Sequence, residues 1–324
     1  MTVAIASYQR RDRLVALLRH IDAQVAGTAA AAGLDVIVIV DGSTDGSLEA
    51  VEHLDLAIPI DVRWQPNGGL ASARNAALAA AGGEIIWFLD DDLVPCPGLV
   101  ARHRDEHQEP PAHLLLGPCK PMASTQAGEA WVRWWDEHYA ELERTGFVDR
   151  FDRFTVANLS GPTEWFRSVG GFDASFFGYG CEDYELGVRM LGRGIVVRFD
   201  PEAAAWHDHA ESEAVTIARK RSLGRNMVRV AKLHPETTAV LFPGRPDRAM
   251  LRLGHLRCRS PLALGAISRV SAFLGVRGGP LLGRYALSLR QLAAAASLAE
   301  GVAEADPALL PVVLEGRPQD QSSG

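Results

Sequence analysis

The chain has 324 residues, of which 33 are Lys or Arg and 40 are Asp or Glu, so its formal net charge is −7. A mildly acidic chain lacks the basic surface of a general nucleic-acid-binding protein, so no nucleic acid is expected among its partners. Hydrophobic residues make up 47% and charged residues 23%, which is the composition of a soluble globular protein with a substantial core.

No targeting or membrane segment is recognisable in the sequence. The first residues lack the charged and apolar regions of a signal peptide, and no apolar run reaches the roughly 18 residues of a membrane span. The four cysteines form no CxxC pair and no metal-finger spacing, so we expect reduced thiols. The expected location is therefore the cytoplasm.

The first part of the chain alternates strand-like and helix-like segments, which predicts an α/β fold with a mostly parallel sheet flanked by helices. The β-branched run VIVIV is typical of a strand buried on both faces. The predicted strands are Val3–Ala6, Val36–Val40, Val62–Gln65 and Ile85–Leu89. Helices are predicted between them over Arg13–Ile21, around Leu48, Val51 and Leu54, and in the Ala-rich segment before Gly82.

The later part of the chain is less regular. The segment EAWVRWWDEHYAELER predicts a helix, GYGCEDYELGVRMLGRG a glycine-bounded turn with a short helix, and IVVRFD a strand. From Ile217 to Arg259 the chain carries 11 Lys or Arg against two acids, so its charge is segregated. Ala/Leu-rich helical stretches follow and end in GRPQDQSSG, which we expect to be a disordered tail.

Two of the predicted buried strands end in carboxylates. Asp41 directly follows the strand at 36–40, and the triplet Asp90–Asp92 directly follows the strand at 85–89. Open α/β sheets bind ligands at this carboxyl edge. Three adjacent carboxylates repel one another, and a hard divalent cation that bridges to phosphate oxygens relieves the repulsion. A solvated acidic loop is the other interpretation of the triplet.

A glycine turn precedes the predicted Ala-rich helix. Asn67, Gly68 and Gly69 allow backbone N–H groups to approach an anion, and Arg74, one turn into the helix, can pair with a phosphate. The segment matches neither the GxGxxG nor the GxxxxGK[ST] phosphate-binding pattern. A turn that only caps the helix, with Arg74 exposed, is the alternative.

Acids and imidazoles also cluster later in the chain. Glu182, Asp183 and Glu185 open the short helix, where acids are either favoured only by the helix dipole or aimed into a site as a general base. His207 and His209 follow the last predicted strand. On a strand the two rings would point to opposite faces, so at most one of them is expected to bind a metal.

Taken in order, these segments resemble the family 2 glycosyltransferases of the GT-A fold, including relatives with a galactosyltransferase-like GGFD and Glu-Asp segment. The ordered set carries the resemblance rather than any single motif, and it covers about residues 3 to 207. The matching stretches are ASYQRRDRL, VDGSTDGS, NGGLASARN, WFLDDDL, ANLSGPTEWFRSVGGFD and GYGCEDYELGVRML.

The resemblance implies transfer of a sugar from a nucleotide-diphosphate donor, most commonly a UDP-sugar, to an acceptor hydroxyl with inversion at the anomeric carbon. It also assigns roles to individual residues. Asp183 matches the general base, Glu182 an acceptor-binding residue, and Asp92 and His207 the ligands of a divalent metal, Mn²⁺ or Mg²⁺. The expected nucleotide-sugar-binding residues are Asp41, Gly69, Arg74, Asp90 and Asp91.

The sequence departs from the family pattern at two positions. Val40 precedes Asp41 where many relatives carry a second acid, which affects an expected donor contact. Cys181 stands where a glycine often precedes the Glu-Asp pair, which affects the expected turn geometry.

The acceptor is expected to be a glycan, a lipid-linked sugar or a small molecule. Trp131, Trp134 and Trp135 share one helical face, and Trp134 is a candidate acceptor-stacking residue, with core packing as the alternative. The basic segment at 219–259 is a candidate contact with a phosphorylated acceptor or with the inner membrane face. A solvated basic surface is the alternative for that segment.

We therefore predict a GT-A catalytic domain over residues 1–212 and a helical, partly basic C-terminal appendage over residues 213–324. Two other functions were weighed. A sugar nucleotidyltransferase would carry an N-terminal GxGxR…K loop, which is missing from this sequence. An inactive nucleotide-sugar-binding or scaffolding relative would have lost the metal or base carboxylates, whereas Asp92 and Asp183 are both present.

Overall fold

The computed structural model describes residues 1–28, 33–109, 113–122, 138–208, 213–242, 297–299 and 301–306. The chain divides into two compact units. The first comprises Met1–Phe177 with Glu182–Ala210, and the second comprises Gly178–Cys181 with Glu211–Gly324.

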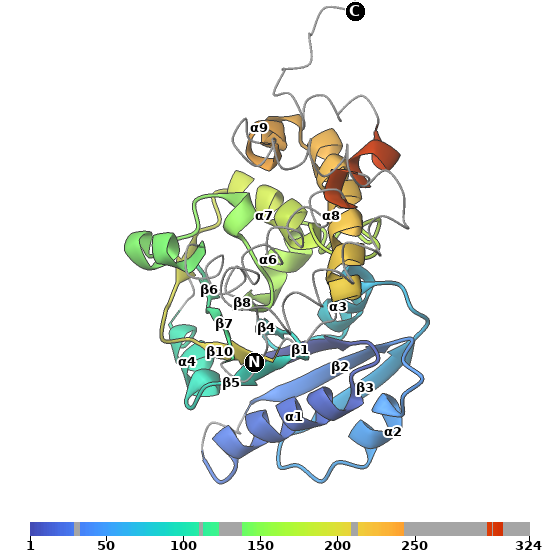
Figure 1. Cartoon of the computed structure of the whole chain (residues 1–324). Helices are drawn as coiled ribbons and strands as arrows, with labels where there is room; N and C mark the ends of the chain where they lie inside the picture. Colours follow the sequence, from blue (N-terminus) through green and yellow to red (C-terminus); the bar gives the residue numbers. More distant parts are fainter. Residues whose placement is uncertain are drawn as a thin grey trace, which may run out of the picture. The chain divides into compact units, whose positions relative to one another are not determined.

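The first unit is built on a seven-stranded sheet of order β3-β2-β1-β4-β8-β6-β9 (Figure 1). Strands β3, β2, β1 and β4 run parallel, β8 is antiparallel to both β4 and β6, and β9 is parallel to β6. The mostly parallel sheet predicted from the sequence is confirmed. The strands are β1 (Thr2–Ser7), β2 (Asp35–Asp41), β3 (Ile60–Gln65), β4 (Ile85–Leu89), β6 (Leu114–Leu116), β8 (Asn158–Pro162) and β9 (Val197–Phe199).

A small second sheet consists of β5 (Leu93–Pro95), β10 (Ala205–His207) and β7 (Cys119–Pro121). Strand β10 lies between the other two, antiparallel to β5 and parallel to β7. None of these three-residue strands was expected from the sequence, because each is too short to show a period. Their pairing brings the C-terminal end of β10 beside the acidic triplet that precedes β5.

Helices cover the sheet where the apolar spacing predicts them, and a few short ones were not foreseen. The expected helices near residues 13–21, 48–54, 70–80 and 182–192 are all present. The helices of the first unit are α1 (Arg11–Val25), α2 (Ser47–Glu52), α3 (Leu70–Ala80), α4 (Leu99–Glu106), α6 (Thr163–Ser168) and α7 (Glu182–Gly192), with a 3-10 turn η2 at Phe151–Arg153. Residues 138–145 are also helical and form the end of the helix predicted for EAWVRWWDEHYAELER.

Strand β2 is buried on both faces, as its VIVIV run predicted. Val36, Val38 and Val40 pack with α1 on one face, and Ile37 and Ile39 pack with α3 on the other. Burial of this kind stabilises the sheet by roughly 1.5–3 kcal/mol for each large apolar side chain.

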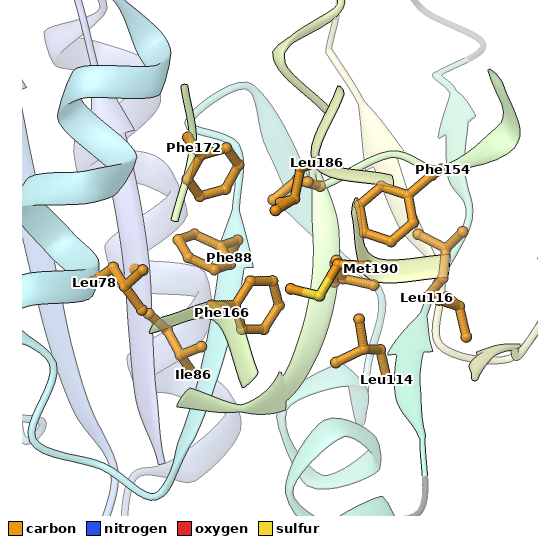
Figure 2. Close-up of a cluster of buried hydrophobic side chains, with 14 of the residues drawn as sticks. Leu78, Ile86, Phe88, Leu114, Leu116, Phe154, Phe166, Phe172, Leu186 and Met190 are labelled. Carbon is orange, nitrogen blue, oxygen red and sulfur yellow. The ribbon is translucent and has the colours of Figure 1, made fainter. Parts of the chain in front are cut away.

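An aromatic cluster fills the α3 side of the core. The ring of Phe88 makes edge-to-face contacts with Phe166 at 5.1 Å and with Phe172 at 5.3 Å between centroids. Figure 2 shows these rings with Met190 and Leu186, which come from α7. The helix that begins at Glu182 is therefore anchored to the sheet by its apolar face.

The opposite side of the sheet contains a buried polar network. The ring of His103 stacks on Trp87 at 4.4 Å, its Nε2 lies 2.9 Å from the Asn158 side-chain oxygen, and its Nδ1 lies 2.7 Å from the Ser160 hydroxyl. The Trp87 indole N–H also donates to Asn158, whose amide nitrogen donates to the Ala203 carbonyl. Burial lowers the pKa of His103 to about 3, so the ring stays neutral.

The second unit contains α8 (Glu213–Leu233), η3 (Pro235–Thr237), α9 (Thr238–Leu241) and helical residues at 297–299 and 301–305. Two glycines allow close backbone packing within it. A Cβ on Gly224 would lie 2.3 Å from the Leu298 carbonyl oxygen, and one on Gly301 would clash with the Arg221 carbonyl.

Part of the basic charge in this unit is ion-paired. Arg221 and Arg225 both pair with Glu304, and Lys232 pairs with Asp306 at 2.9 Å. These three cations are thus partly neutralised by acids that are distant in sequence.

The remainder of the predicted basic segment, residues 243–259, and the predicted tail GRPQDQSSG at 316–324 lie outside the described residues. The contact of this segment with a membrane surface stays a prediction. Among the described residues, no helix is both long and apolar enough to cross a membrane.

The buried network predicts a large effect for Asn158→Ala. The substitution removes the Asn158 side-chain partner of the Trp87 N–H, of His103 Nε2 and of the Ala203 carbonyl, so we expect the free energy of unfolding to fall by about 2–4 kcal/mol. Urea unfolding measures the change. The control is Arg63→Ala, which removes an exposed ion pair with Asp61 and should change stability by less than about 0.5 kcal/mol. Equal effects of the two substitutions would contradict this account.

Candidate active site

Three neighbouring parallel strands deliver charged groups to one edge of the main sheet. Strand β2 ends at Asp41, β4 runs into Asp90, and β1 leads through a short turn to Arg10. Because β1 lies between β2 and β4, the carboxyl ends of all three strands meet at this edge.

Asp41 organises the glycine turn. Its Oδ1 accepts the Gly68 N–H and its Oδ2 the Gly69 N–H, both at 2.9 Å, and Oδ1 also accepts the Gln65 side-chain N–H at 2.8 Å. Gly69 has φ +83°, and a Cβ there would meet the ring of Phe177 at 3.2 Å, so a glycine is required. The anion that the two glycine N–H groups bind in this structure is therefore the carboxylate of Asp41.

Arg74 is buried rather than exposed, with 5% of its surface accessible. Its Nη2 lies 2.8 Å from Asp90 Oδ1 and its Nη1 lies 3.1 Å from Glu182 Oε1. One guanidinium thus joins the acidic triplet to the Glu-Asp pair, although the two are about ninety residues apart in sequence.

Glu182 and Asp183 form the first turn of α7, and the Tyr184 N–H donates to Asp183 Oδ1 at 3.0 Å. Burial and the neighbouring charge of Glu182 raise the pKa of Asp183 to about 8, although Arg74 acts in the opposite direction. Burial also raises the pKa of Glu182. A carboxylate with so high a pKa is a stronger proton acceptor than an ordinary Asp.

The residue before this pair has an unusual backbone. Cys181 adopts φ +74°, which is the left-handed region that favours glycine. The family pattern often places glycine at this position, so the departure noted in the sequence falls on a residue where a side chain strains the turn.

Asp92 faces His207 across the short β5–β10 pairing. His207 Nε2 lies 3.3 Å from Asp92 Oδ1, and the Asp208 backbone N–H donates to the Asp92 carbonyl at 2.9 Å. The described residues contain no group of three or more metal-ligating side chains.

Two facing donors nevertheless fit a metal that takes its remaining ligands from water and phosphate. Adjacent ligands of an octahedral ion with bonds of about 2.1 Å lie roughly 3 Å apart. The 3.3 Å between the Asp92 oxygen and the His207 nitrogen is close to that value, and a carboxylate oxygen suits Mn²⁺ or Mg²⁺.

Arg10 is the charged residue of this site to which the sequence analysis gave no role. Its Nη1 lies 2.6 Å from Asp91 Oδ1 and 2.8 Å from Asp92 Oδ2. The pKa of Arg10 is raised, because the attraction of these two acids exceeds the opposing effect of burial. The strand order indicates this contact, because a residue that follows β1, such as Arg10, lies close to the acids that follow the neighbouring strand β4.

Most of the predicted site residues therefore lie at one edge of the first unit. Asp41 holds Gly69, and Arg74 joins Asp90 to Glu182 of the Glu-Asp pair. Arg10 contacts Asp91 and Asp92, and His207 faces Asp92. Trp134 and His209 lie outside the described residues, so their predicted roles are untested.

The sequence matches two known protein families. Residues 2–163 match the family described as "Glycosyl transferase family 2", and residues 137–208 match "N-terminal domain of galactosyltransferase". The two matches together cover the strands and helices that carry the site.

Curated relatives match over part of their length. Validoxylamine A glucosyltransferase of Streptomyces hygroscopicus subsp. jinggangensis is 30% identical over 271 residues, which are 75% of this chain and 63% of the relative. Pre-mycofactocin glycosyltransferase of Mycobacterium tuberculosis is 30% identical over 218 residues, which are 64% of this chain and 45% of the relative. The chain thus spans less than two thirds of the length of either protein.

A solved structure shares the fold. The mannosyltransferase PcManGT of Pyrobaculum calidifontis, in complex with GDP-Man and Mn²⁺, has a TM-score of 0.59 and 20% sequence identity over 91% of this chain and 85% of that chain. The likeness confirms the predicted GT-A fold.

The raised pKa of Asp183 predicts a pH-dependent stability difference from Asp183→Asn. Between the ordinary value of 3.8 and about 8, the folded protein holds a proton that the unfolded chain releases, so wild-type stability falls as pH rises through this range. The Asn variant has no such group. We expect the melting temperature of Asp183→Asn to rise by several degrees relative to that of wild type as the pH is raised from 6 to 9. A stability difference of 1 kcal/mol corresponds to roughly 2–4 °C in melting temperature.

The matched control for this experiment is Asp12→Asn, because Asp12 is an exposed acid that pairs with Arg11. Its melting curve should run parallel to that of wild type across the same pH range. Parallel curves for Asp183→Asn as well would contradict the predicted titration.

Proposed function

The chain belongs to glycosyl transferase family 2, and we propose that it transfers a sugar from a nucleotide-diphosphate donor to an acceptor hydroxyl. The proposed reaction inverts the anomeric carbon and requires Mn²⁺ or Mg²⁺, and the proposed donor is a UDP-sugar. Matches to named glycosyltransferases support the general activity. The arrangement of the site supports the metal and the stereochemistry, whereas the UDP-sugar donor rests on the resemblance to other family 2 enzymes.

The bridge made by Arg74 carries the proposal. The Arg74 guanidinium contacts both Asp90 and Glu182. Asp90 belongs to the acidic triplet that contains the candidate metal ligand Asp92, and Glu182 precedes the candidate base Asp183. Inverting transfer needs the leaving group and the base on opposite faces of the sugar. The bridge supports this division of tasks, because it joins the acidic triplet to the Glu-Asp pair through one guanidinium.

On the leaving-group side, Asp92 and His207 would hold the divalent metal. A bound metal supplies positive charge for the diphosphate as its bond to the sugar breaks. Asp41 and Gly69 would position the nucleoside end of the donor. Asp41 fixes the conformation of this glycine turn, because it accepts the N–H groups of Gly68 and Gly69.

The remaining proposed donor contacts come from Arg74, Asp90 and Asp91. Arg74 would donate a hydrogen bond to a phosphate, because it lies in the helix directly after the glycine turn. Its two acidic partners keep the guanidinium in place before the donor arrives.

On the acceptor side, Asp183 would remove the proton from the attacking hydroxyl. Its pKa of about 8 makes its ionised form a strong base for a carboxylate, and the reaction should therefore speed up as pH rises toward that value. Glu182, held by Arg74, would orient the acceptor.

The acceptor is proposed to be a glycan, a lipid-linked sugar or a small molecule, with Trp134 as a stacking surface. Peripheral contact with the inner membrane face through residues 219–259 also stays a proposal. The named relatives act as a glucosyltransferase and a mannosyltransferase, and the latter was solved with GDP-Man. GDP is thus the first nucleotide to compare with UDP.

Asp183→Asn is expected to abolish transfer and to leave donor binding nearly unchanged. Asn cannot accept the proton, and the loss should reach at least about 10²-fold in turnover. Release of nucleoside diphosphate, followed with a library of acceptors, measures turnover, and calorimetry measures binding of the donor. The control is Asp61→Asn, on the exposed face of β3, which should retain full turnover. Wild-type turnover in Asp183→Asn would exclude it as the base.

Asp92→Asn is expected to weaken metal-dependent binding of the nucleotide. Calorimetric titration with UDP, GDP, ADP and CDP, each with and without Mn²⁺, identifies the donor nucleotide in wild type. The variant should lose most of the gain that Mn²⁺ supplies, because a neutral amide is a poor ligand for a hard cation. Asp105→Asn, an exposed acid paired with Arg104, is the control. Absence of binding to every nucleotide in wild type would refute the proposed function.

A further inference from the structure

A single guanidinium bridges the two acids beside the candidate metal site and offsets one of their two negative charges. Arg10 Nη1 bridges Asp91 Oδ1 at 2.6 Å and Asp92 Oδ2 at 2.8 Å. Only 4% of Asp91 and 5% of Asp92 is accessible, so neither charge is well screened by water. Buried adjacent carboxylates repel each other strongly unless a cation lies between them.

The residue before Arg10 has an unusual backbone conformation that hydrogen bonds hold in place. Gln9, the preceding residue, adopts φ +56°, which a residue with a side chain rarely does. Its N–H donates to Ser43 Oγ at 2.9 Å, and its side-chain amide donates to Thr44 Oγ1 at 3.1 Å. A strained turn persists when surrounding hydrogen bonds hold it, and here they fix the residue that carries the guanidinium.

The two oxygens of Asp92 face different partners. Oδ2 accepts from Arg10, and Oδ1 lies 3.3 Å from His207 Nε2. A divalent cation held by Oδ1 and the imidazole would therefore share one carboxylate with a guanidinium. Two cations on one buried carboxylate repel each other, so each weakens the binding of the other.

We propose that Arg10, held between Asp91 and Asp92, is a resident cation that competes with the divalent metal for the charge of Asp92, so that the metal binds tightly only together with a diphosphate that takes over the guanidinium. The inference rests on the proposed function and adds a coupling between metal and nucleotide. A guanidinium forms paired hydrogen bonds with phosphate oxygens as readily as with carboxylates, so the donor offers Arg10 a replacement partner.

The coupling follows from a competition between two arrangements of Arg10. When the guanidinium bridges the two acids, the metal binds weakly. The apparent affinity for the metal is therefore proportional to the fraction of protein in which the guanidinium is displaced. A diphosphate raises that fraction. By reciprocity, the metal must raise the affinity for the diphosphate by the same factor.

The test is direct binding of Mn²⁺ to the full chain without nucleotide, measured from the signal of free Mn²⁺ by electron paramagnetic resonance. Arg10→Gln removes the competing charge and keeps a polar side chain of similar reach. We expect it to bind Mn²⁺ at least about tenfold more tightly than wild type. In the presence of the nucleoside diphosphate that binds wild type, the advantage of the variant should shrink or reverse.

Two further variants separate the specific effect from general ones. Arg11→Gln removes the neighbouring exposed guanidinium, which pairs with Asp12, and it should bind Mn²⁺ like wild type. Arg10→Lys keeps the charge without the planar fork and should fall between wild type and Arg10→Gln. Thermal melting of each variant verifies that it is folded.

Each outcome decides the question. Equal Mn²⁺ affinity of wild type and Arg10→Gln, with metal-dependent nucleotide binding intact, would overturn the competition and leave the proposed function standing. An equal increase in Mn²⁺ affinity in Arg11→Gln would show a general effect of charge and would also overturn the proposed competition. No Mn²⁺ binding by any variant, even with nucleotide, would overturn both the inference and the proposed metal dependence.

Discussion

The site depends on keeping five carboxylates together at one edge of a sheet. Asp91, Asp92 and Glu182 are buried, and Asp90 and Asp183 are partly exposed beside them, so their mutual repulsion is only partly screened by water. Two arginines offset this repulsion. Arg74 joins Asp90 to Glu182, and Arg10 joins Asp91 to Asp92. Because both guanidinium groups are held by the fold, the acids can stay close without a bound ligand.

The division between the two arginines matches a division of chemical tasks. Arg74 lies between the triplet and the candidate base, where a fixed charge sets the separation of the reacting groups. Arg10 lies beside the candidate metal ligands Asp92 and His207, where a displaceable charge can respond to the donor. Removal of either arginine leaves buried acids unpaired, so the two positions affect stability as well as function.

The pKa values follow the same arrangement. Asp183 has its pKa raised to about 8 by burial and by Glu182, and Asp91 has its pKa raised to about 6 by burial, against the attraction of Arg10. Both acids hold protons more readily than an exposed Asp. A cation bound at Asp92 would favour the ionised form of the adjacent Asp91.

The sequence by itself determined strands β1 to β4 and β9, helices α1, α2, α3 and α7, and the residues at their ends. The period of VIVIV, the acids after two buried strands and the glycine turn were enough to predict the parallel sheet and most candidate residues, because these features are local. The tertiary structure alone decided which charges meet. The pairing of β5 with β10 beside His207, the burial of Arg74 and the bridge from Arg10 to Asp91 join segments far apart in the chain. Such contacts depend on strand order and packing, and no local pattern encodes them.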